Sequence, residues 1–258
     1  MANNEFMDPT PASLRLPDSL DEVRVTSLPH AAYYISDFIT QEEEQAILDK
    51  IASAPKPRWK QLSHRRLQSW PSDLVNNKLM DAPLPIWLSD PIVPRLKSIR
   101  LSQEPDSPDI FSDSPHQKPN HVLINEYPPG IGIMPHKDGA AYHPVVCTVS
   151  LGASLCLNIY KSKDDGALDP NPVWKILQEP RSLLITTSDL YTDFLHGIED
   201  ITEDIELSNS TIANWELLRS PKEFANGCNV RKTRTSLTYR DVVKVSKLGG
   251  KLGFLQKK

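Results

Sequence analysis

From residue 121 onward, the hydrophobic pattern of this chain is that of short β-strands. Before that point the apolar residues recur at helical spacing, and afterwards they alternate or form short runs bounded by Gly, Pro, Asp or Asn. Many short strands preceded by helices predict an α+β protein whose core is a jelly-roll or barrel. The strand-like runs occupy residues 121–127, 144–161, 182–187, 193–198 and 234–245.

Two helices are predicted ahead of this β region. Thr40 and Glu43 have the spacing of a capping box, in which the hydroxyl accepts from the amide three residues on and the glutamate reaches back. Pro55 ends that helix, and a second helix begins at Asp90 with Pro91 in its first position. Their apolar stripes are Ile47, Ile51 and Ala54 in the first and Ile92, Leu96 and Ile99 in the second.

Proline is abundant in the chain, with 23 prolines against 10 glycines. This ratio favours a rigid, loop-rich β architecture over long helices, and the absence of a Gly-X-Y period excludes collagen. With 258 residues, of which 39% are hydrophobic, the chain is long enough to bury a core, and one domain with elaborated loops is expected.

Charge is unevenly distributed along the chain. The net charge is −4, which by itself argues against a nucleic-acid partner. However, residues 56–66 hold five basic residues and no acidic one, and residues 217–258 hold eleven basic and two acidic ones. Because local potential steers association, these blocks can attract a polyanion, although they are equally compatible with solvated faces.

Cysteine usage indicates a reducing compartment. Cys147, Cys156 and Cys228 are odd in number and form no CxxC pair, so a disulfide scaffold is not expected. The N-terminal residues show neither a signal nor a transit peptide, and the longest uncharged stretch, residues 139–160, is interrupted by polar residues. We therefore predict a protein of the nucleus and cytoplasm with no membrane partner.

A histidine and a carboxylate lie close together after a turn-rich segment. On a strand, residues two apart point to the same face, so His136 and Asp138 are predicted to reach one metal ion. His196 follows 58 residues after Asp138 on another predicted strand. Two histidines and one carboxylate form the facial triad of non-haem Fe(II) oxygenases. The alternatives are an accidental H-x-D and a core histidine at 196.

Two arginines near the C-terminal end lie on one predicted strand. An iron of this kind needs an electron-donating co-substrate, usually the dicarboxylate 2-oxoglutarate, and a guanidinium binds a carboxylate with two hydrogen bonds. Arg234 and Arg240 are six residues apart, which places both on one face of a strand. The alternative is a pair of surface arginines in a basic tail.

These motifs in this order resemble a known family. Asn125, Tyr127 and Gly130 form the pattern N-x-Y-x-x-G, and the H-x-D motif begins eleven residues after the asparagine. The late histidine and the R-x5-R pattern complete a resemblance to the AlkB family of Fe(II)/2-oxoglutarate-dependent dioxygenases, over roughly residues 30–245. The resemblance implies a double-stranded β-helix core, a cupin-like jelly-roll, with N-terminal helices packed on it.

The resemblance also implies roles for individual residues. The iron ligands would be His136, Asp138 and His196. Arg234 would bind the distal carboxylate of 2-oxoglutarate with help from Tyr127, while Asn125 and Arg240 would serve the metal end or its surroundings. Ser236 stands where the family usually has an asparagine. The implied cofactors are Fe(II), 2-oxoglutarate as co-substrate, and O₂.

A substrate-recognition lid is implied before the catalytic core. Basic and aromatic side chains alternate there, which suits phosphate contact combined with base stacking. The alternative for Trp59 and Trp70 is that they are core anchors. The predicted lid residues are Arg58, Trp59, Lys60, His64, Arg65, Arg66 and Trp70.

The predicted organisation has four parts. They are an extended lead-in (1–30), a helical support with the lid (31–120), the dioxygenase core (121–245) and a basic tail (246–258). Within the core, an acidic insertion at about residues 198–230 is expected as a loop at the rim of the barrel, with a solvated linker as the alternative.

Three functions are compatible with these features. The first is oxidative demethylation of N-alkylated bases in RNA or single-stranded DNA, with succinate, CO₂ and formaldehyde as products. The second is the same chemistry on a protein side chain, and the third is a nucleic-acid-binding module with weak turnover. A monomer is expected in each case.

Overall fold

Two antiparallel sheets form the core of the computed structural model, which describes residues 14–29, 31–162 and 167–246. The larger sheet has seven strands, in the order β1 (Ala32–Ile35), β10 (Leu183–Thr187), β7 (Val145–Leu151), β14 (Arg234–Arg240), β5 (His121–Tyr127), β3 (Arg66–Trp70) and β2 (Lys60–Gln61). The smaller sheet has four, in the order β6 (Ile133–His136), β11 (Phe194–Ile198), β8 (Leu155–Lys161) and β9 (Trp174–Gln178). This arrangement is the predicted jelly-roll.

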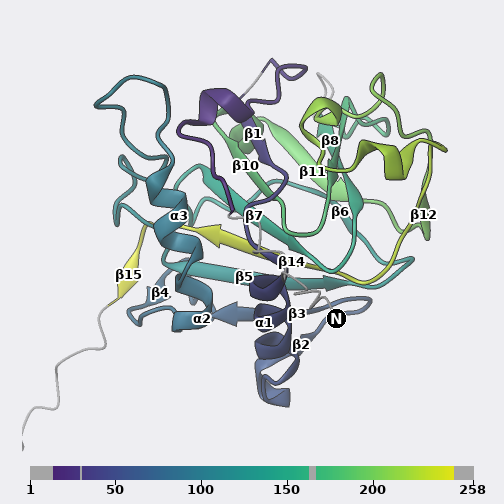
Figure 1. Cartoon of the computed structure of the whole chain (residues 1–258). Helices are drawn as coiled ribbons and strands as arrows, with labels where there is room; N and C mark the ends of the chain where they lie inside the picture. The colour runs from purple at the N-terminus through teal and green to yellow at the C-terminus, as the bar shows by residue number, and fades with distance from the viewer. Residues whose placement is uncertain (1–13, 30, 163–166, 247–258) are drawn as a thin grey trace, which may run out of the picture.

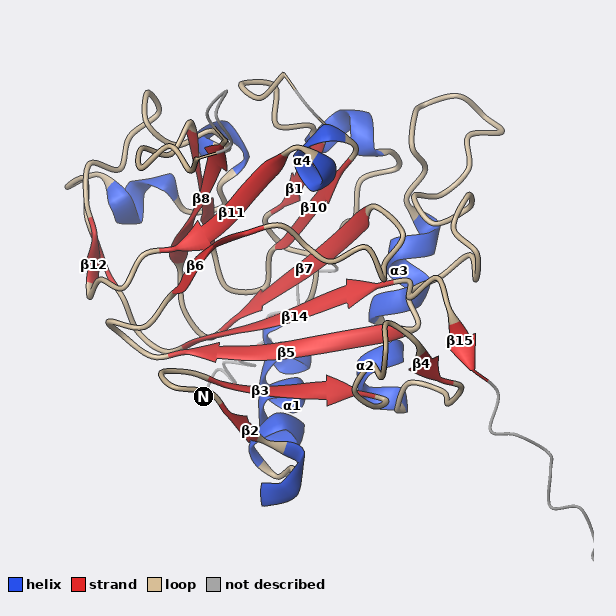
Figure 2. Cartoon of the chain, turned by 180° about the vertical axis from the view of Figure 1, so that it is seen from behind, coloured by secondary structure: helices blue, strands red, loops and turns tan. Residues whose placement is uncertain are grey.

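Short helices and strand pairs surround the two sheets (Figures 1 and 2). The helices are α1 (Gln41–Ala52), α2 (Ile86–Ser89), α3 (Ile92–Ser98) and α4 (Asp189–Thr192), with 3-10 turns η1 (Leu20–Val23), η2 (Lys56–Arg58), η3 (Trp215–Leu217) and η4 (Pro221–Phe224). The pairs are β12 (Glu203–Asp204) with β13 (Asn229–Val230), and β4 (Leu79–Met80) with β15 (Val245–Ser246). No helix in the described ranges is long and apolar enough to cross a membrane.

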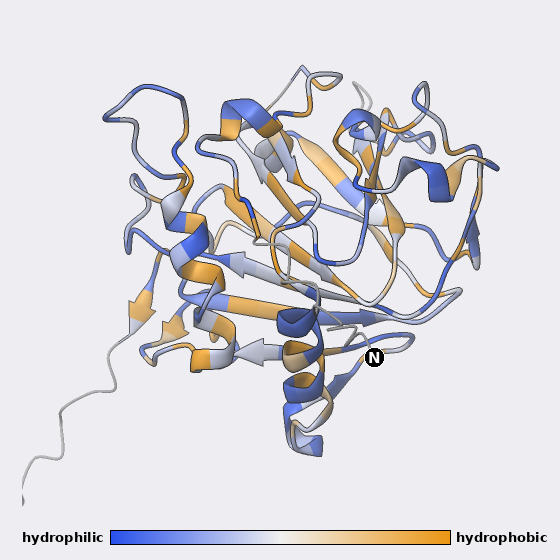
Figure 3. Cartoon of the chain, in the orientation of Figure 1, coloured by the Kyte–Doolittle hydropathy of each residue, from blue (hydrophilic) through white to orange (hydrophobic). Residues whose placement is uncertain are grey.

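The larger sheet separates an apolar core from a polar cavity. In β7, the odd-numbered residues from Val145 to Leu151 join the cluster that contains Ile47 and Ile51 of α1 and Leu96 of α3. The even-numbered residues Val146, Thr148 and Ser150 point the other way, between the sheets. Figure 3 shows hydrophobic residues concentrated along strands such as β5 and β7, whereas the visible side of α1 is largely hydrophilic. Because successive side chains of a strand point to opposite faces, one face of the sheet packs against the core and the other faces the cavity.

The predicted helix at Thr40 is confirmed. The Thr40 hydroxyl accepts from the Glu43 amide at 3.2 Å, and the Glu43 carboxylate accepts from the Thr40 amide at 2.8 Å. The second predicted helix is also present, with Pro91 as the N-cap of α3. The single turn α2 was not predicted, since four residues are too few to show a helical period.

Two expectations about the first 120 residues differ from the structure. The described part of the predicted lead-in carries η1, and Leu20, Val25 and Leu28 are buried in the core, so it is packed rather than simply extended. The predicted lid supplies β2 and β3, and β3 pairs with β5 at the edge of the larger sheet. The lid is therefore part of the sheet, because its alternating side chains have one face to bury.

The acidic insertion is neither a rim loop nor a solvated linker. Asn214 accepts from the Leu177 amide at 2.9 Å and donates to the Leu177 carbonyl at 2.8 Å, so the insertion covers the edge strand β9. An edge strand left open would expose unpaired backbone groups. Apolar residues of the insertion are buried beneath it: Leu207, Ile212, Leu218 and Phe224.

Candidate active site

A cavity of about 460 Å³ lies between the two sheets. The strands β5, β7, β10 and β14 of the larger sheet line one side, and β6, β8 and β11 of the smaller sheet line the other. The inward residues of β14 and β5, namely Arg234, Ser236, Thr238, Arg240, Leu123, Asn125 and Tyr127, follow the even spacing of a strand face.

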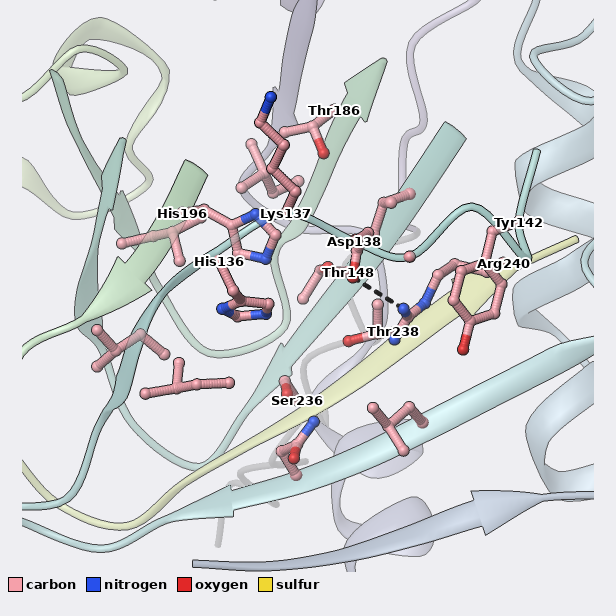
Figure 4. A pocket seen from close by; sticks show the side chains of 18 of the residues that line it. His136, Lys137, Asp138, Tyr142, Thr148, Thr186, His196, Ser236, Thr238 and Arg240 are labelled. Carbon is pink, nitrogen blue, oxygen red and sulfur yellow. Dashed lines mark hydrogen bonds and ion pairs between the residues drawn. The ribbon is translucent and has the colours of Figure 1, made fainter. Parts of the chain in front are cut away.

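His136, Asp138 and His196 meet at this cavity (Figure 4). One ligand atom from each of the three lies within 4.8 Å of the others. His196 on β11 is paired in register with His136 on β6, and their ring centroids are 4.4 Å apart. Two imidazoles and one carboxylate match the donor set that holds Fe(II) with open coordination positions.

Asp138 reaches the site by a different route from the one predicted. The strand β6 ends at His136, so Asp138 lies in the following loop, not on the same strand face. Arg240 holds the carboxylate there, with Nη1 donating to Oδ1 at 2.9 Å (Figure 4). The Arg240 guanidinium also stacks on the Tyr142 ring at 4.3 Å. Arg240 therefore orients one oxygen of Asp138 and leaves the other available to a metal ion.

Each of the two histidines has a ring nitrogen available to a metal ion. Nδ1 of His136 lies 2.9 Å from the carbonyl oxygen of Met134, which can only accept, so Nδ1 carries the proton and Nε2 is available as a ligand atom. Burial lowers the pKa of His196 to about 4, with Asp138 opposing this shift and His136 adding to it. At neutral pH His196 is thus the neutral imidazole that a metal ion requires.

Arg234 lines the same cavity and has no carboxylate partner among the described residues. Its side chain is 2% exposed. Its Nη2 donates to the Ser150 hydroxyl at 2.8 Å and to Oε1 of Gln178 at 2.7 Å, while Nε is buried without a partner. Burial lowers the pKa of Arg234 to about 10, so it remains charged at neutral pH. A buried cation of this kind fits an anionic ligand such as a carboxylate.

The other predicted co-substrate residues surround Arg234 and the cavity floor. The Tyr127 ring lies 5.8 Å from the Arg234 guanidinium carbon, and the two residues are paired in register. Asn125 and Ser236 are also paired, and Oδ1 of Asn125 is buried without a hydrogen-bond partner. Unpartnered polar atoms on one surface indicate that a polar ligand belongs there.

Gln178 and Ser150 were not predicted as site residues from the sequence. Gln178 is at the end of β9, a strand that was not among the predicted runs, and nothing in its neighbours marks it as polar and buried. Ser150 lies on a predicted strand and faces the cavity with Thr148, so the alternation of polar and apolar residues in β7 was a usable signal.

Most of the predicted lid residues are engaged within the protein. Lys60 pairs with Asp73, and the Arg66 guanidinium binds both oxygens of Glu126 at 2.7 and 2.8 Å. His64 lines a second cavity of about 290 Å³ beside the first. These residues do not present free charge to the main cavity.

Both predicted lid tryptophans pack against the apolar core, as the alternative interpretation had it. Trp70 meets Trp87 edge to face at 5.6 Å and carries the Arg58 guanidinium on its ring at 4.1 Å. Trp59 is covered in the same way by Arg66.

Arg65 is the predicted lid residue that lines the main cavity, and it also lines the second one. Its Nε is buried without a partner, and no described carboxylate pairs with it. With Lys137, Arg234 and Arg240 it gives the cavity lining four cations, against the single carboxylate of Asp138. The site therefore has a strong positive potential.

Comparisons with known proteins agree with this geometry. The model of the 2OG-Fe(II) oxygenase superfamily matches residues 31–240. The "Probable RNA/DNA demethylase ALKBH6" of Danio rerio is 36% identical over 233 residues, which cover 88% of this chain and 92% of that protein. The "tRNA (carboxymethyluridine(34)-5-O)-methyltransferase alkbh8" of Xenopus tropicalis is 26% identical over 86% of this chain but only 33% of its own length.

A solved structure shares the fold. The structure of OsALKBH1 has a TM-score of 0.51 and 16% identity, and the match covers 83% of this chain and 99% of that one.

Proposed function

Because the chain belongs to the AlkB family within the 2OG-Fe(II) oxygenase superfamily, we propose that it oxidatively demethylates N-alkylated bases in RNA or single-stranded DNA. The predicted resemblance to this family is confirmed. The protein is an Fe(II)/2-oxoglutarate-dependent oxidoreductase, and its family uses Fe(II), 2-oxoglutarate and O₂. The products of the proposed reaction are succinate, CO₂, formaldehyde and the demethylated base.

His136, Asp138 and His196 would hold the iron, which when loaded with 2-oxoglutarate and O₂ supplies the oxidation of the N-methyl group. The chain itself positions the reactants. Arg240 fixes Asp138, and His136 is fixed by the Met134 carbonyl. A ligand set held in this way needs little rearrangement when the metal binds.

Arg234 would bind the distal carboxylate of 2-oxoglutarate, with the Tyr127 hydroxyl at the same end. Asn125 would serve the metal end. Ser236 has a shorter side chain than the usual asparagine, so its contact to the co-substrate would run through water. The apolar residues Leu157, Ile159 and Leu184 on the cavity wall exclude bulk solvent.

The excess of positive charge in the cavity is the observation that favours a nucleic-acid substrate. The charges of Fe(II) and of the 2-oxoglutarate dianion cancel, so the loaded site keeps three more positive than negative charges among its lining residues. Phosphates compensate such a surplus, whereas a neutral or cationic protein side chain does not. The net charge of −4 belongs to the whole chain and differs in sign from the local charge at this cavity.

A formaldehyde-release screen tests the proposal. We expect release from N-methylated single-stranded oligonucleotides in the presence of Fe(II) and 2-oxoglutarate, and none from methylated peptides. The His136→Ala variant is the control for chemistry that does not depend on the site. Release from peptides alone would establish the protein-substrate alternative, and tight oligonucleotide binding without release would establish the binding-module alternative.

Arg65 is expected to contact one substrate phosphate. Arg65→Met should reduce the slope of log affinity against log salt by about 0.7 for single-stranded RNA, the value for one lost phosphate contact. Fluorescence anisotropy at several salt concentrations measures this slope. Arg58→Met is the matched control, since the Arg58 charge already lies on the Trp70 ring. An equal slope in the wild type and Arg65→Met would contradict the assignment.

The location in nucleus and cytoplasm and the monomeric state stay predictions from the sequence.

A further inference from the structure

Arg234 differs from the two other buried arginines of the same region in what holds it. Arg231 donates to Asp204 at 2.7 Å, and Arg240 donates to Asp138 at 2.9 Å, so each has a carboxylate partner. Arg234, on the same strand as Arg240, is held instead by the amide oxygen of Gln178 and the hydroxyl of Ser150. The partner that a buried guanidinium would ordinarily have is replaced by two neutral groups.

The side chains of Arg234, Gln178 and Ser150 are each hydrogen-bonded to the other two. Oε1 of Gln178 accepts from Nη2 of Arg234 at 2.7 Å and from the Ser150 hydroxyl at 3.0 Å. Gln178 is 1% exposed and Ser150 is fully buried, so water does not compete for these hydrogen bonds. The hydrogen bonds of the Arg234 side chain to described residues all leave from Nη2, while its Nε has no partner. The guanidinium is therefore oriented without being neutralised.

The strand that carries Gln178 is fixed on both sides by the acidic insertion. Asn214 makes two hydrogen bonds to the backbone of Leu177, the residue before Gln178. The carboxylate of Glu179, the residue after it, accepts from the Arg219 and Ser220 amides at 2.9 Å each. The insertion thus holds the two neighbours of Gln178 in place, and with them the amide that contacts Arg234.

We propose that Gln178 is a positioning residue for 2-oxoglutarate binding: it orients the Arg234 guanidinium through its amide oxygen and leaves the full positive charge to the distal carboxylate of the co-substrate. This inference rests on the proposed role of Arg234. A carboxylate at position 178 would pair with Arg234 and compete directly with the co-substrate, whereas the amide has the same shape and no charge.

The substitution Gln178→Glu tests this distinction. We expect the Kd of 2-oxoglutarate, measured by isothermal titration calorimetry of the full chain loaded with Mn(II), to rise about tenfold or more, as for the loss of a charge-assisted hydrogen bond. The Kd of Mn(II) itself should not change, because position 178 does not contact the triad. In turnover, the KM for 2-oxoglutarate should rise while the KM for the nucleic-acid substrate stays constant.

A second variant separates orientation from charge. Gln178→Leu keeps the charge of Arg234 but removes the hydrogen bond, so a rise of about fivefold in the Kd of 2-oxoglutarate is expected, below that of Gln178→Glu. Gln68→Glu is the matched control, since Gln68 is an equally buried amide on the other face of the sheet. It should affect thermal stability without a selective effect on 2-oxoglutarate.

Arg234→Met distinguishes failure of the inference from failure of the proposed function. If Arg234→Met loses 2-oxoglutarate binding while both Gln178 variants bind within twofold of wild type, Gln178 has no positioning role. If Arg234→Met binds normally, the co-substrate site itself is assigned wrongly. Should Gln178→Glu fail to fold, Gln178→Leu decides by the same criterion.

Discussion

Replacing His196 by alanine is expected to remove Fe(II) binding and to lower turnover by at least about 100-fold. Loss of a residue that only hydrogen-bonds to a metal ligand already lowers metal affinity or activity by about 10–100-fold, and His196 is itself a proposed ligand. His196 is paired with His136 across β11 and β6, and one ligand atom from each lies within 4.8 Å of Asp138. The remaining His136 and Asp138 cannot form a facial triad on their own.

Anaerobic titration with Fe(II) and 2-oxoglutarate checks this expectation through the metal-to-ligand absorption band. The band should be absent in His196→Ala, in His136→Ala and in Asp138→Ala. His143→Ala is the control, because His143 follows Tyr142 but does not line the cavity. An undiminished band in any of the three ligand variants would show that the metal is held elsewhere.

Replacing Arg231 by methionine is expected to lower the free energy of unfolding by about 3–5 kcal/mol, the cost of leaving a buried charge without its partner. Asp204 and Arg231 are each 3% exposed, and the Arg231 guanidinium donates to both oxygens of Asp204, at 3.1 and 2.7 Å. Asp204 also accepts from the Asn229 amide. Loss of the arginine therefore destabilises the base of the insertion.

Urea unfolding followed by fluorescence measures this change. The exposed pair of Lys60 and Asp73 is the comparison, since breaking it by Lys60→Met should cost at most about 1 kcal/mol. The double variant Arg231→Met/Asp204→Leu should recover much of the loss, because no charge then remains buried. A single variant as stable as wild type would mean that Asp204 gains water or another cation when Arg231 is absent.

The fold was largely predictable because the relevant signals are local. The runs at 121–127, 182–187 and 193–198 are β5, β10 and β11, and the run at 144–161 contains β7 and β8. Strand alternation and a capping box depend on residues within a few positions of each other. The strands β6 and β9 were not among the predicted runs. The first has four residues, one of them Pro135, and the second has an apolar run of only two residues, Ile176 and Leu177.

The charge composition of the predicted lid does not tell which of its basic residues are paired with a carboxylate. The block at 56–66 predicted a basic surface, yet Lys60 and Arg66 are neutralised by Asp73 and Glu126, which lie 13 and 60 residues further along the chain. Arg65, which is adjacent to Arg66, points into the cavity. The pattern of alternating side chains separates the two arginines, but only the paired strands decide which of them meets a carboxylate.

The sequence by itself determined the donor types, their order and the faces that the strands would bury. The motif of His136, Asp138, His196 and Arg234 could be recognised because each residue has a chemistry that few others supply. Only the tertiary structure decided that Arg234 is held by Gln178, that Arg240 serves Asp138, and that the insertion fixes β9. These contacts join residues 37 to 102 positions apart, and such pairings follow from the packing of whole sheets rather than from any local pattern.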